Sequence, residues 1–296
     1  MHKTIKAHFA LLIVNIIYGL NYSIAKEVMP EYVMPFAFVL MRVGGALILF
    51  WIASAFFTKE KIDRKDFPRI ALLAFFGVAV NQLLFLKGLS LTSPINASII
   101  MLSNPIIVLI ASALVLKEKI SKIKITGVFF GLTGAFLLLF FNKSFSIGSA
   151  TAIGDIMILI NSMSWAIFII MLNPLIKKYN AFTIVKWVFL FGFIYVLPFG
   201  YSEFKQINWH SIPPNIYWGI GFVVVATTFI AYFLNTYALR ELKPEVVSIY
   251  IYFQPFIAAL VAIYYFNNDE FDTRKLISGI LIIVGIYLVS MRLKKT

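Results

Sequence analysis

Residues 94–118 read PINASIIMLSNPIIVLIASALVLKE, and residues 244–270 read PEVVSIYIYFQPFIAALVAIYYFNNDE. Each stretch is an apolar run that begins with a proline and carries a second proline near its centre. The second prolines, Pro105 and Pro255, lie 150 residues apart, as do the two prolines that open the stretches. Since an apolar run of about 20 residues is enough for a helix to cross a bilayer, the two stretches predict the same membrane helix built twice.

The repeat extends beyond these two helices. Glu118 and Gly127 lie nine residues apart, and Glu270 and Gly279 have the same separation, displaced by 152 residues. An insertion of two residues in the loop between them accounts for the change from 150 to 152. We place the two predicted repeats at residues 1–142 and 150–293.

The composition is that of a membrane protein. Hydrophobic residues make up 61% of the 296 residues, charged residues 13%, and the mean hydropathy is +0.90, whereas a soluble domain carries about 25% charged residues. Apolar runs recur along the chain with no polar domain between them, which excludes a water-soluble fold. At about 20 residues for each span, we expect ten transmembrane helices near residues 6–27, 35–57, 68–88, 93–115, 122–142, 152–173, 181–201, 215–239, 244–266 and 273–293.

Five helices in each repeat is an odd number, so the second repeat must enter the membrane from the side opposite to the first. We therefore expect an all-α integral membrane protein of two inverted five-helix repeats. The first span follows Lys3 and Lys6 and could be read as a signal peptide. Its apolar stretch is long for that role and nine further spans follow, so we expect it to be retained.

The net charge of +13 comes from basic residues in short loops, a placement that favours contact with lipid headgroups over nucleic acid. With a cytoplasmic N-terminus, nineteen Lys and Arg residues face the cytoplasm and six face the other side, while Arg42 lies inside a span. The positive-inside rule then predicts a multi-pass protein of the inner (plasma) membrane with both termini in the cytoplasm. Cysteine is absent, which excludes disulfides and thiolate metal ligands.

The sequence carries no enzyme motif that we can identify. It has no P-loop, no H-E-x-x-H and no G-x-S-x-G, and its histidines lie near the N-terminus and in a loop, at positions 2, 8 and 210. We therefore predict no catalytic residue, no metal and no cofactor. Catalysis inside a membrane needs clustered ionisable groups, so a membrane-embedded enzyme, or a structural scaffold, is only the alternative class.

Several motifs are similar to those of a known family. Residues 18–26 read YGLNYSIAK, Arg42 lies inside the second span, and residues 89–139 carry further motif residues: Ala97, Ser98, Pro105, Glu118, Gly127 and Gly134. In these motifs, and over nearly the whole chain, the sequence resembles the EamA-type members of the drug/metabolite transporter superfamily. The second copy departs from the family pattern at Ala166, where glycine is usual, and at Gln254.

The resemblance implies a basket of ten helices around a central substrate cavity, formed mainly by helices 1, 3, 4, 6, 8 and 9. It also implies a carrier that opens this cavity alternately to the two sides, and known relatives include exporters of amino acids and other metabolites. We therefore expect a secondary transporter, an exporter or permease of a small metabolite, with an amino acid as the first candidate. Export of aromatic or lipid-like drugs is the alternative.

Two mid-helix motifs are the sharpest candidates for the substrate site, Asn104-Pro105 and Gln254-Pro255. Each proline removes a backbone hydrogen bond, at a cost of about 3 kcal/mol in a helix interior, and frees the carbonyl four residues earlier. Lipid cannot satisfy such carbonyls, and paired interruptions in two halves indicate a transporter's binding site. The alternative is that both prolines only kink their helices for packing.

Polar and aromatic side chains share helix faces in other spans. Such groups could supply the few placed hydrogen bonds and stacking surfaces that a cavity needs, or they could only join helices, at about 1 kcal/mol each. Because several converge, we favour the cavity. They are Asn15, Tyr18 and Tyr22 in the first span, Asn81 and Gln82 in the third, Asn161 and Trp165 in the sixth, and Thr228, Tyr232 and Asn235 in the eighth.

Arg42 is the buried charge, since it lies inside the second span. A charge at such a place costs about 2.5–3.5 kcal/mol, so it should be paired or near water. It could attract a carboxylate substrate, or it could extend outward and hold the fold through a carbonyl or carboxylate. We favour the structural role from the sequence, because the second helix is not among those expected to line the cavity.

Overall fold

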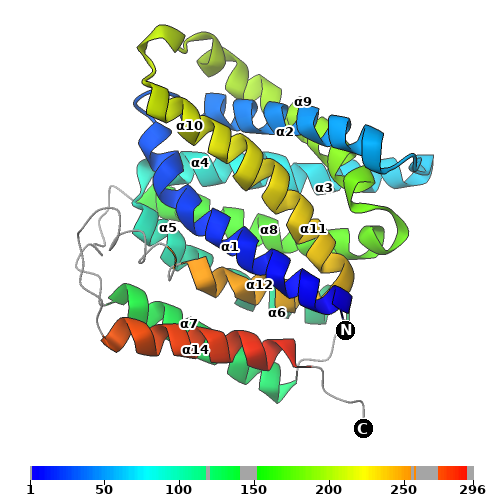
Figure 1. Cartoon of the computed structure of the whole chain (residues 1–296), viewed down its shortest axis with the longest axis vertical. Coiled ribbons are helices and arrows are strands. Elements are labelled where there is room, and N and C mark those ends of the chain that lie inside the picture. Colours follow the sequence, from blue (N-terminus) through cyan, green and yellow to red (C-terminus); the bar gives the residue numbers. More distant parts are fainter. Residues whose placement is uncertain (1, 118–120, 141–151, 255–256, 258–272, 292–296) are drawn as a thin grey trace.

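The computed structural model describes residues 2–117, 121–140, 152–254, 257 and 273–291. Within these ranges every regular element is helical. Long helices run across the molecule roughly parallel to one another and form a bundle (Figure 1). Six helical segments in this part of the chain are long and apolar enough to cross a membrane.

The elements of the first half lead from the N-terminus to residue 140. They are α1 (His2–Val28), α2 (Pro35–Phe57), η1 (Arg64–Asp66), α3 (Phe67–Ala74), η2 (Phe75–Val80), α4 (Asn81–Leu91), α5 (Pro94–Met101), α6 (Asn104–Val115) and α7 (Lys122–Phe140). The second half contains α8 (Ala152–Lys178), α9 (Ala181–Lys205), η4 (Trp209–Ser211), α10 (Pro214–Phe222), η5 (Val223–Ile230), α11 (Ala231–Glu241), α12 (Pro244–Ile249), η6 (Tyr250–Phe253) and α14 (Thr273–Ser290).

The six membrane-length segments correspond to the first three expected spans and to the sixth, seventh and eighth. The expected span 35–57 coincides with α2, and the other five agree with the structure to within five residues at each end. The remaining four expected spans are shorter or lie partly outside the described residues. Two of them contain short apolar helices, Asn104–Val115 and Gly279–Val289.

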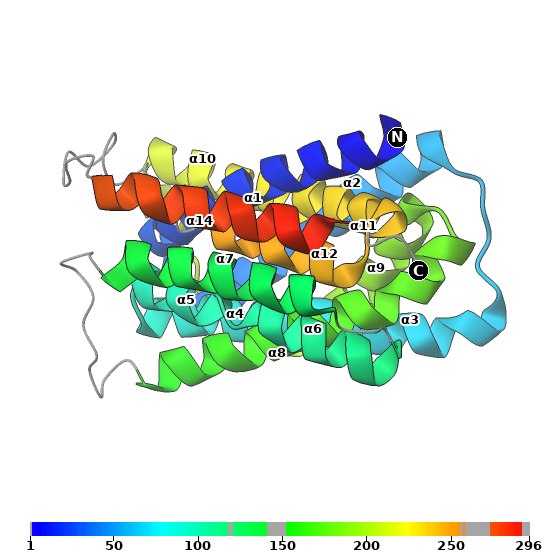
Figure 2. The same ribbon diagram turned by 90° about the horizontal axis from the view of Figure 1, so that it is seen from below.

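Corresponding helices of the two halves run in opposite directions. α1 runs away from the end of the bundle at which the N-terminus is marked, whereas α8 runs toward that end (Figures 1 and 2). α14 finishes at the same end of the bundle at which α1 starts. This is the arrangement that an odd number of spans in each repeat requires.

Both halves contain a π-helical segment at matching positions, which the sequence analysis did not predict. η2 starts at Phe75, and η5 starts 148 residues later at Val223. Such i→i+5 turns are rare and often mark functional sites. Side-chain hydroxyls donate to three carbonyl oxygens within these segments: Ser164 to Phe76 at 2.6 Å, Tyr232 to Gly77 at 2.8 Å, and Thr228 to Val223 at 2.7 Å.

The interruptions expected at the mid-helix prolines lie just before them. Pro105 is the second residue of α6, which a short turn separates from α5. In that turn the amide and the hydroxyl of Ser103 both donate to the carbonyl oxygen of Ile100, at 3.0 and 2.7 Å. At the corresponding place in the second half, the helix tightens to the 3-10 segment Tyr250–Phe253. Pro255 itself lies outside the described residues.

Two closely packed helix pairs flank the centre of the bundle. α7 packs along α14 at one edge, and α2 packs along α9 toward the opposite edge (Figure 1). Gly285 permits the first contact, because a Cβ there would lie 2.6 Å from both the carbonyl oxygen of Gly127 and the amide nitrogen of Gly131. Small residues allow membrane helices to approach this closely. The helices between the two pairs, together with α2, form the site described next.

Candidate functional site

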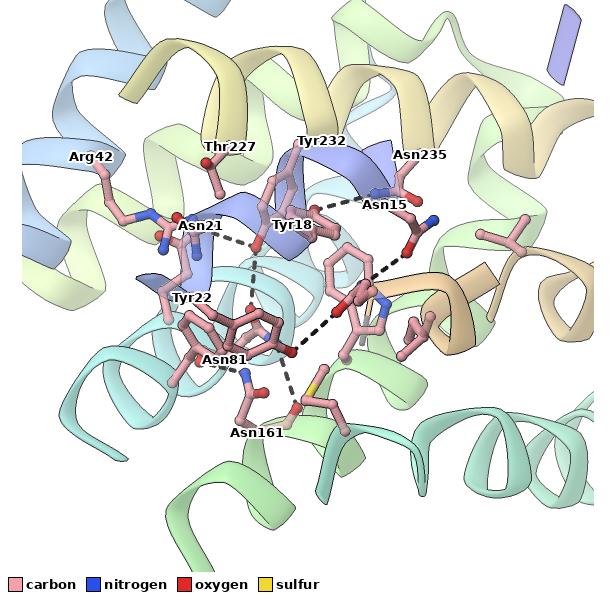
Figure 3. A pocket seen from close by; sticks show the side chains of 17 residues that line it. Asn15, Tyr18, Asn21, Tyr22, Arg42, Asn81, Asn161, Thr227, Tyr232 and Asn235 are labelled. Atoms are coloured by element: carbon pink, nitrogen blue, oxygen red, sulfur yellow. Dashed lines mark hydrogen bonds between the residues drawn. The ribbon is translucent and has the colours of Figure 1, made fainter. Parts of the chain in front are cut away.

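A cavity lies between helices from both halves of the chain (Figure 3). Amides, aromatic rings, aliphatic side chains and one arginine form its wall, and the described lining includes no acidic residue. The lining residues are Asn15, Tyr18, Asn21 and Tyr22 of α1, Arg42 of α2, Asn81, Gln82 and Phe85 of α4, Met101 of α5, Asn161 and Trp165 of α8, Thr227 of η5, Tyr232 and Asn235 of α11, Val247 of α12, Ile251 of η6, and Gln254.

The amide of Gln254 joins the second half of the chain to α1. Its Oε1 accepts a hydrogen bond from the hydroxyl of Tyr22 at 3.1 Å, and its Nε2 donates to Oδ1 of Asn15 at 2.8 Å. Asn15 is fixed in turn, because its Nδ2 donates to the carbonyl oxygen of Leu11 at 2.8 Å. Gln254 is 3% exposed, so these bonds form away from bulk solvent and bridge the two halves.

A second network centres on the hydroxyl of Tyr232. It donates to the carbonyl oxygen of Gly77 at 2.8 Å and accepts from Nε2 of Gln82 at 3.1 Å. Beside it, the amide of Asn161 donates to the carbonyl oxygen of Asn81 at 2.7 Å, and the Asn81 amide returns a longer contact of 3.4 Å. Gln82 and Tyr232 occupy equivalent positions of the two repeats, since they lie 150 residues apart. This hydrogen bond therefore joins two residues of corresponding sequence position, one from each half of the chain.

Aromatic rings supply the apolar part of the wall. Tyr232 meets Trp165 edge to face at 5.5 Å between ring centroids, and Tyr22 meets Phe85 in the same way at 5.7 Å. The hydroxyl of Tyr18 accepts a hydrogen bond from Nδ2 of Asn235 at 3.2 Å. Edge-to-face pairs add to the energy of burial, so these rings form an ordered surface against which a bound solute can stack.

The structure places Arg42 at the cavity, although the second helix was not expected there. Its side chain extends from α2 far enough to reach η5, where Nε donates to Oγ1 of Thr228 at 2.9 Å. Arg42 is 4% exposed, and the part of the chain that is described offers it no ion pair with a carboxylate. A guanidinium has five N–H donors, so one bond to a hydroxyl leaves most of its capacity unused.

Several buried oxygen atoms in the lining have no hydrogen-bond partner in the described structure. An unpaired buried polar group costs about 1–3 kcal/mol, and such groups are rare enough to need a reason. A cavity that receives water or a polar solute is such a reason. The atoms are Oδ1 of Asn21, Oε1 of Gln82, Oδ1 of Asn161 and Oγ1 of Thr227.

The structure brings most of the candidate residues together at the cavity, but not all of them. Asn104 is fully buried, and its Nδ2 donates to the carbonyl oxygen of Ser162 at 2.8 Å, which turns it toward α8. Pro105 is buried beside it, outside the lining. The hydroxyl of Thr228, a residue of η5, is bonded to Arg42, while its neighbour Thr227 lines the cavity. The π-helical turn explains the last difference, since it shifts the face that α-helical spacing predicts.

Six lining residues were not among the candidate side chains: Asn21, Phe85, Met101, Thr227, Val247 and Ile251. Asn21 belongs to the motif at residues 18–26 and could have been included on that ground. Phe85 and Val247 carry no local signal, because an apolar residue in a membrane span looks the same whether it faces lipid or a cavity.

In the described part of the chain, no group of three His, Asp or Glu residues could hold a metal ion.

Comparison with known proteins agrees with this architecture. The sequence is similar to an uncharacterized transporter of Archaeoglobus fulgidus, at 25% identity over 97% of this chain and 98% of the relative. It is similar to the uncharacterized transporter YyaM of Bacillus subtilis, at 22% identity over 97% and 94%, and to a WAT1-related protein of Arabidopsis thaliana, at 23% identity over 98% and 79%. A solved crystal structure shares the fold, with a TM-score of 0.74 at 14% identity over 97% of this chain and 96% of that one.

The family match covers both halves of the chain. The profile of the EamA-like transporter family matches residues 5–140 and again residues 152–291, which confirms the resemblance found in the sequence. The names of the family and of these relatives indicate a transporter rather than an enzyme. This chain therefore belongs to the EamA-like transporter family of the drug/metabolite transporter superfamily and is a multi-pass membrane transporter.

Proposed function

We propose that this protein is a secondary carrier that moves a small amphipathic metabolite by alternating access around the central cavity, with an amino acid as the first candidate cargo. The observation that carries the proposal is the composition of the cavity wall, which takes polar side chains from both halves of the chain. When one half rocks against the other, a site between them opens first to one side of the membrane and then to the other.

The proposed topology is ten membrane spans in two inverted five-helix repeats, at residues 1–142 and 150–293. The opposite directions of α1 and α8 support it, and so do the π-helical segments that start 148 residues apart, at Phe75 and Val223. We propose both termini in the cytoplasm and the plasma membrane as the location, because the Lys and Arg residues divide nineteen to six between the two sides.

The chemistry of the wall favours an amphipathic metabolite over an aromatic or lipid-like drug. Apolar solutes would suit Trp165 and Phe85 but would leave the unpaired oxygens of Gln82 and Asn161 buried without a partner. Each such group costs about 1–3 kcal/mol. A solute with a polar end and a small apolar part satisfies both kinds of lining, which is the usual design of a small-molecule site.

The test is counterflow in proteoliposomes that contain the purified protein. Vesicles are loaded with unlabelled amino acids, and uptake of each labelled amino acid is measured against a panel of labelled aromatic drugs. The expected result is saturable counterflow of a metabolite. Gln254→Leu should weaken this counterflow. Ile156→Leu is the control and should leave it unchanged, because the side chain of Ile156 is 58% exposed on the outside of α8. If only drugs showed saturable flux, the proposed metabolite cargo would be wrong. If no small solute showed saturable flux, the proposed carrier function would be wrong.

A further inference from the structure

We propose that Arg42 binds a carboxylate of the transported solute, and that the cargo is a small monocarboxylate that also carries hydrogen-bond donors. The inference rests on the carrier function proposed above and narrows its cargo. Among the described lining residues, Arg42 is the one that carries a charge. It is therefore the residue able to select a carboxylate over an uncharged solute of the same shape.

The guanidinium of Arg42 is buried without a counter-ion in the described structure. The residue is 4% exposed, and the described ion pairs belong to Lys124 and Lys178. A buried charge is costly unless it is paired or hydrated. Because no acidic side chain lines the described cavity, the charge must be balanced from the cavity itself, by water in the empty carrier and by an anion when cargo is bound.

Contacts on the protein side hold the guanidinium in place. Nε of Arg42 donates to Oγ1 of Thr228 at 2.9 Å, and the hydroxyl of Thr228 donates to the carbonyl oxygen of Val223 at 2.7 Å. Since the single hydroxyl proton goes to Val223, the oxygen of Thr228 is oriented to accept from Nε. The side chain reaches from α2 toward the other lining residues (Figure 3), so the planar fork can meet a carboxylate with two parallel hydrogen bonds.

The balance of charge points to a single carboxylate. One guanidinium neutralises one negative charge, and a dianion such as phosphate would find no second cation on the described wall. The unpaired amide oxygens of Asn21 and Gln82 are acceptors, and the unpaired hydroxyl of Thr227 can accept as well as donate. They complement hydroxyl or ammonium groups on the same solute. Together these groups match a small solute with one carboxylate and a few hydrogen-bond donors.

The experiment compares solutes that keep the carboxylate with matching solutes that lack it. Counterflow of labelled phenylalanine and leucine is measured in proteoliposomes, together with the corresponding 2-hydroxy acids, which keep the carboxylate, and the amino-acid amides, which lose it. We expect the wild-type carrier to prefer a carboxylate over the matching amide by about thirtyfold or more, the usual effect of removing one partner of a buried charged pair. Equal transport of acid and amide would overturn the inference.

Variants of Arg42 separate recognition from a structural role. Arg42→Gln should abolish the preference for acid over amide, and Arg42→Lys should keep part of it, because an ammonium retains the charge but not the fork. Thr228→Val keeps the charge, removes the bond that orients it, and should reduce the preference by about threefold to tenfold. Ile48→Val, on the exposed face of α2 at 61% exposure, is the matched control.

The outcomes distinguish this inference from the proposed function. Lower thermal stability of Arg42→Gln with an unchanged preference for the acid would mean that Arg42 only supports the fold. If Arg42→Gln does not fold, an unchanged preference in both Arg42→Lys and Thr228→Val would overturn the inference. Flux of uncharged solutes or amines without any flux of monocarboxylates would also overturn it while leaving the carrier intact. No flux of any solute would instead contradict the carrier.

Discussion

The bridge formed by Gln254 gives the sharpest prediction about the site. Its amide accepts from Tyr22 at 3.1 Å and donates to Asn15 at 2.8 Å. Gln254→Leu removes both bonds and keeps the approximate volume of the side chain. Because the partners line a cavity rather than a packed core, and because a membrane helix accepts leucine readily, we expect the amount of folded protein to stay nearly unaltered.

The size of the effect follows from the bonds that are lost. A hydrogen bond contributes about 0.5–1.5 kcal/mol, so the two bonds stabilise the bridged state by about 1–3 kcal/mol. If the amide exchanges one of them for a bond to the solute during transport, its loss weakens affinity by about twofold to twelvefold. We therefore expect KM in counterflow to rise by several-fold to about tenfold for Gln254→Leu.

A double-mutant cycle shows whether the bridge itself is responsible. Tyr22→Phe removes the hydroxyl that donates to Gln254 and leaves the ring in place. If the two side chains act through their hydrogen bond, the combination of Tyr22→Phe with Gln254→Leu should weaken affinity no more than Gln254→Leu alone. The reasoning is refuted if Gln254→Leu leaves KM unchanged, or if the two changes add in full.

Three further outcomes are expected. Pro105→Ala restores an amide hydrogen near the turn between α5 and α6. This change should straighten the segment and slow turnover more than it raises KM. An effect on melting temperature alone would mean that the proline serves packing. The ion pair between Lys124 and Glu245 is buried, with side chains 12% and 1% exposed, so Glu245→Gln should destabilise the protein by about 3–5 kcal/mol in detergent melts. Changing Lys124 to Met as well should recover part of that loss. Since the native chain has no cysteine, Lys61→Cys and His210→Cys can be labelled singly in intact cells; an impermeant thiol reagent should reach the second and not the first, and the reverse would overturn the proposed orientation.

The membrane-length helices and the repeat could be predicted because both depend on signals that are local in the sequence. Hydropathy over about 20 residues identifies a span without knowledge of its neighbours, and proline is favoured at the first position of a helix. Pro35 therefore gave the first residue of α2, and Pro94 and Pro244 gave those of α5 and α12. Polar residues on one helix face were good guides to the cavity where the helix is regular, as for Asn15, Tyr18 and Tyr22 in α1.

The cavity lining differs from the expected set of residues where the hydrogen-bond register of a helix changes. The π-helical segment η5 brings Thr227 to the cavity in place of Thr228, and no residue type in that segment signals the change. Arg42 was assigned to the fold because its helix lies outside the expected central set, yet its side chain is long enough to reach the cavity from α2. Whether a side chain reaches a cavity, and where the hydrogen-bond register of a helix changes, depend on how the helices pack together. A single sequence does not reveal this packing.

Asn104 and Gln254 differ in their contacts although they have corresponding positions in the two repeats. They occupy equivalent positions 150 residues apart, yet Gln254 bridges the cavity to α1 while Asn104 is turned away and bonded to Ser162. Inverted repeats can exchange their conformations when access alternates, so we expect a second state in which Asn104 faces the cavity and Gln254 is withdrawn from it.

Asn104→Cys tests that second state, because Asn104 is fully buried in the state described here. A small thiol reagent should modify this cysteine slowly in the empty carrier and faster during turnover, when the second state is populated. A cysteine at position 102 is the control, since Leu102 is equally buried, at 2% exposure, and lies outside the cavity lining. Equal rates at both positions, with and without transport, would mean that Asn104 is a fixed packing residue and that the two repeats do not exchange roles at this site.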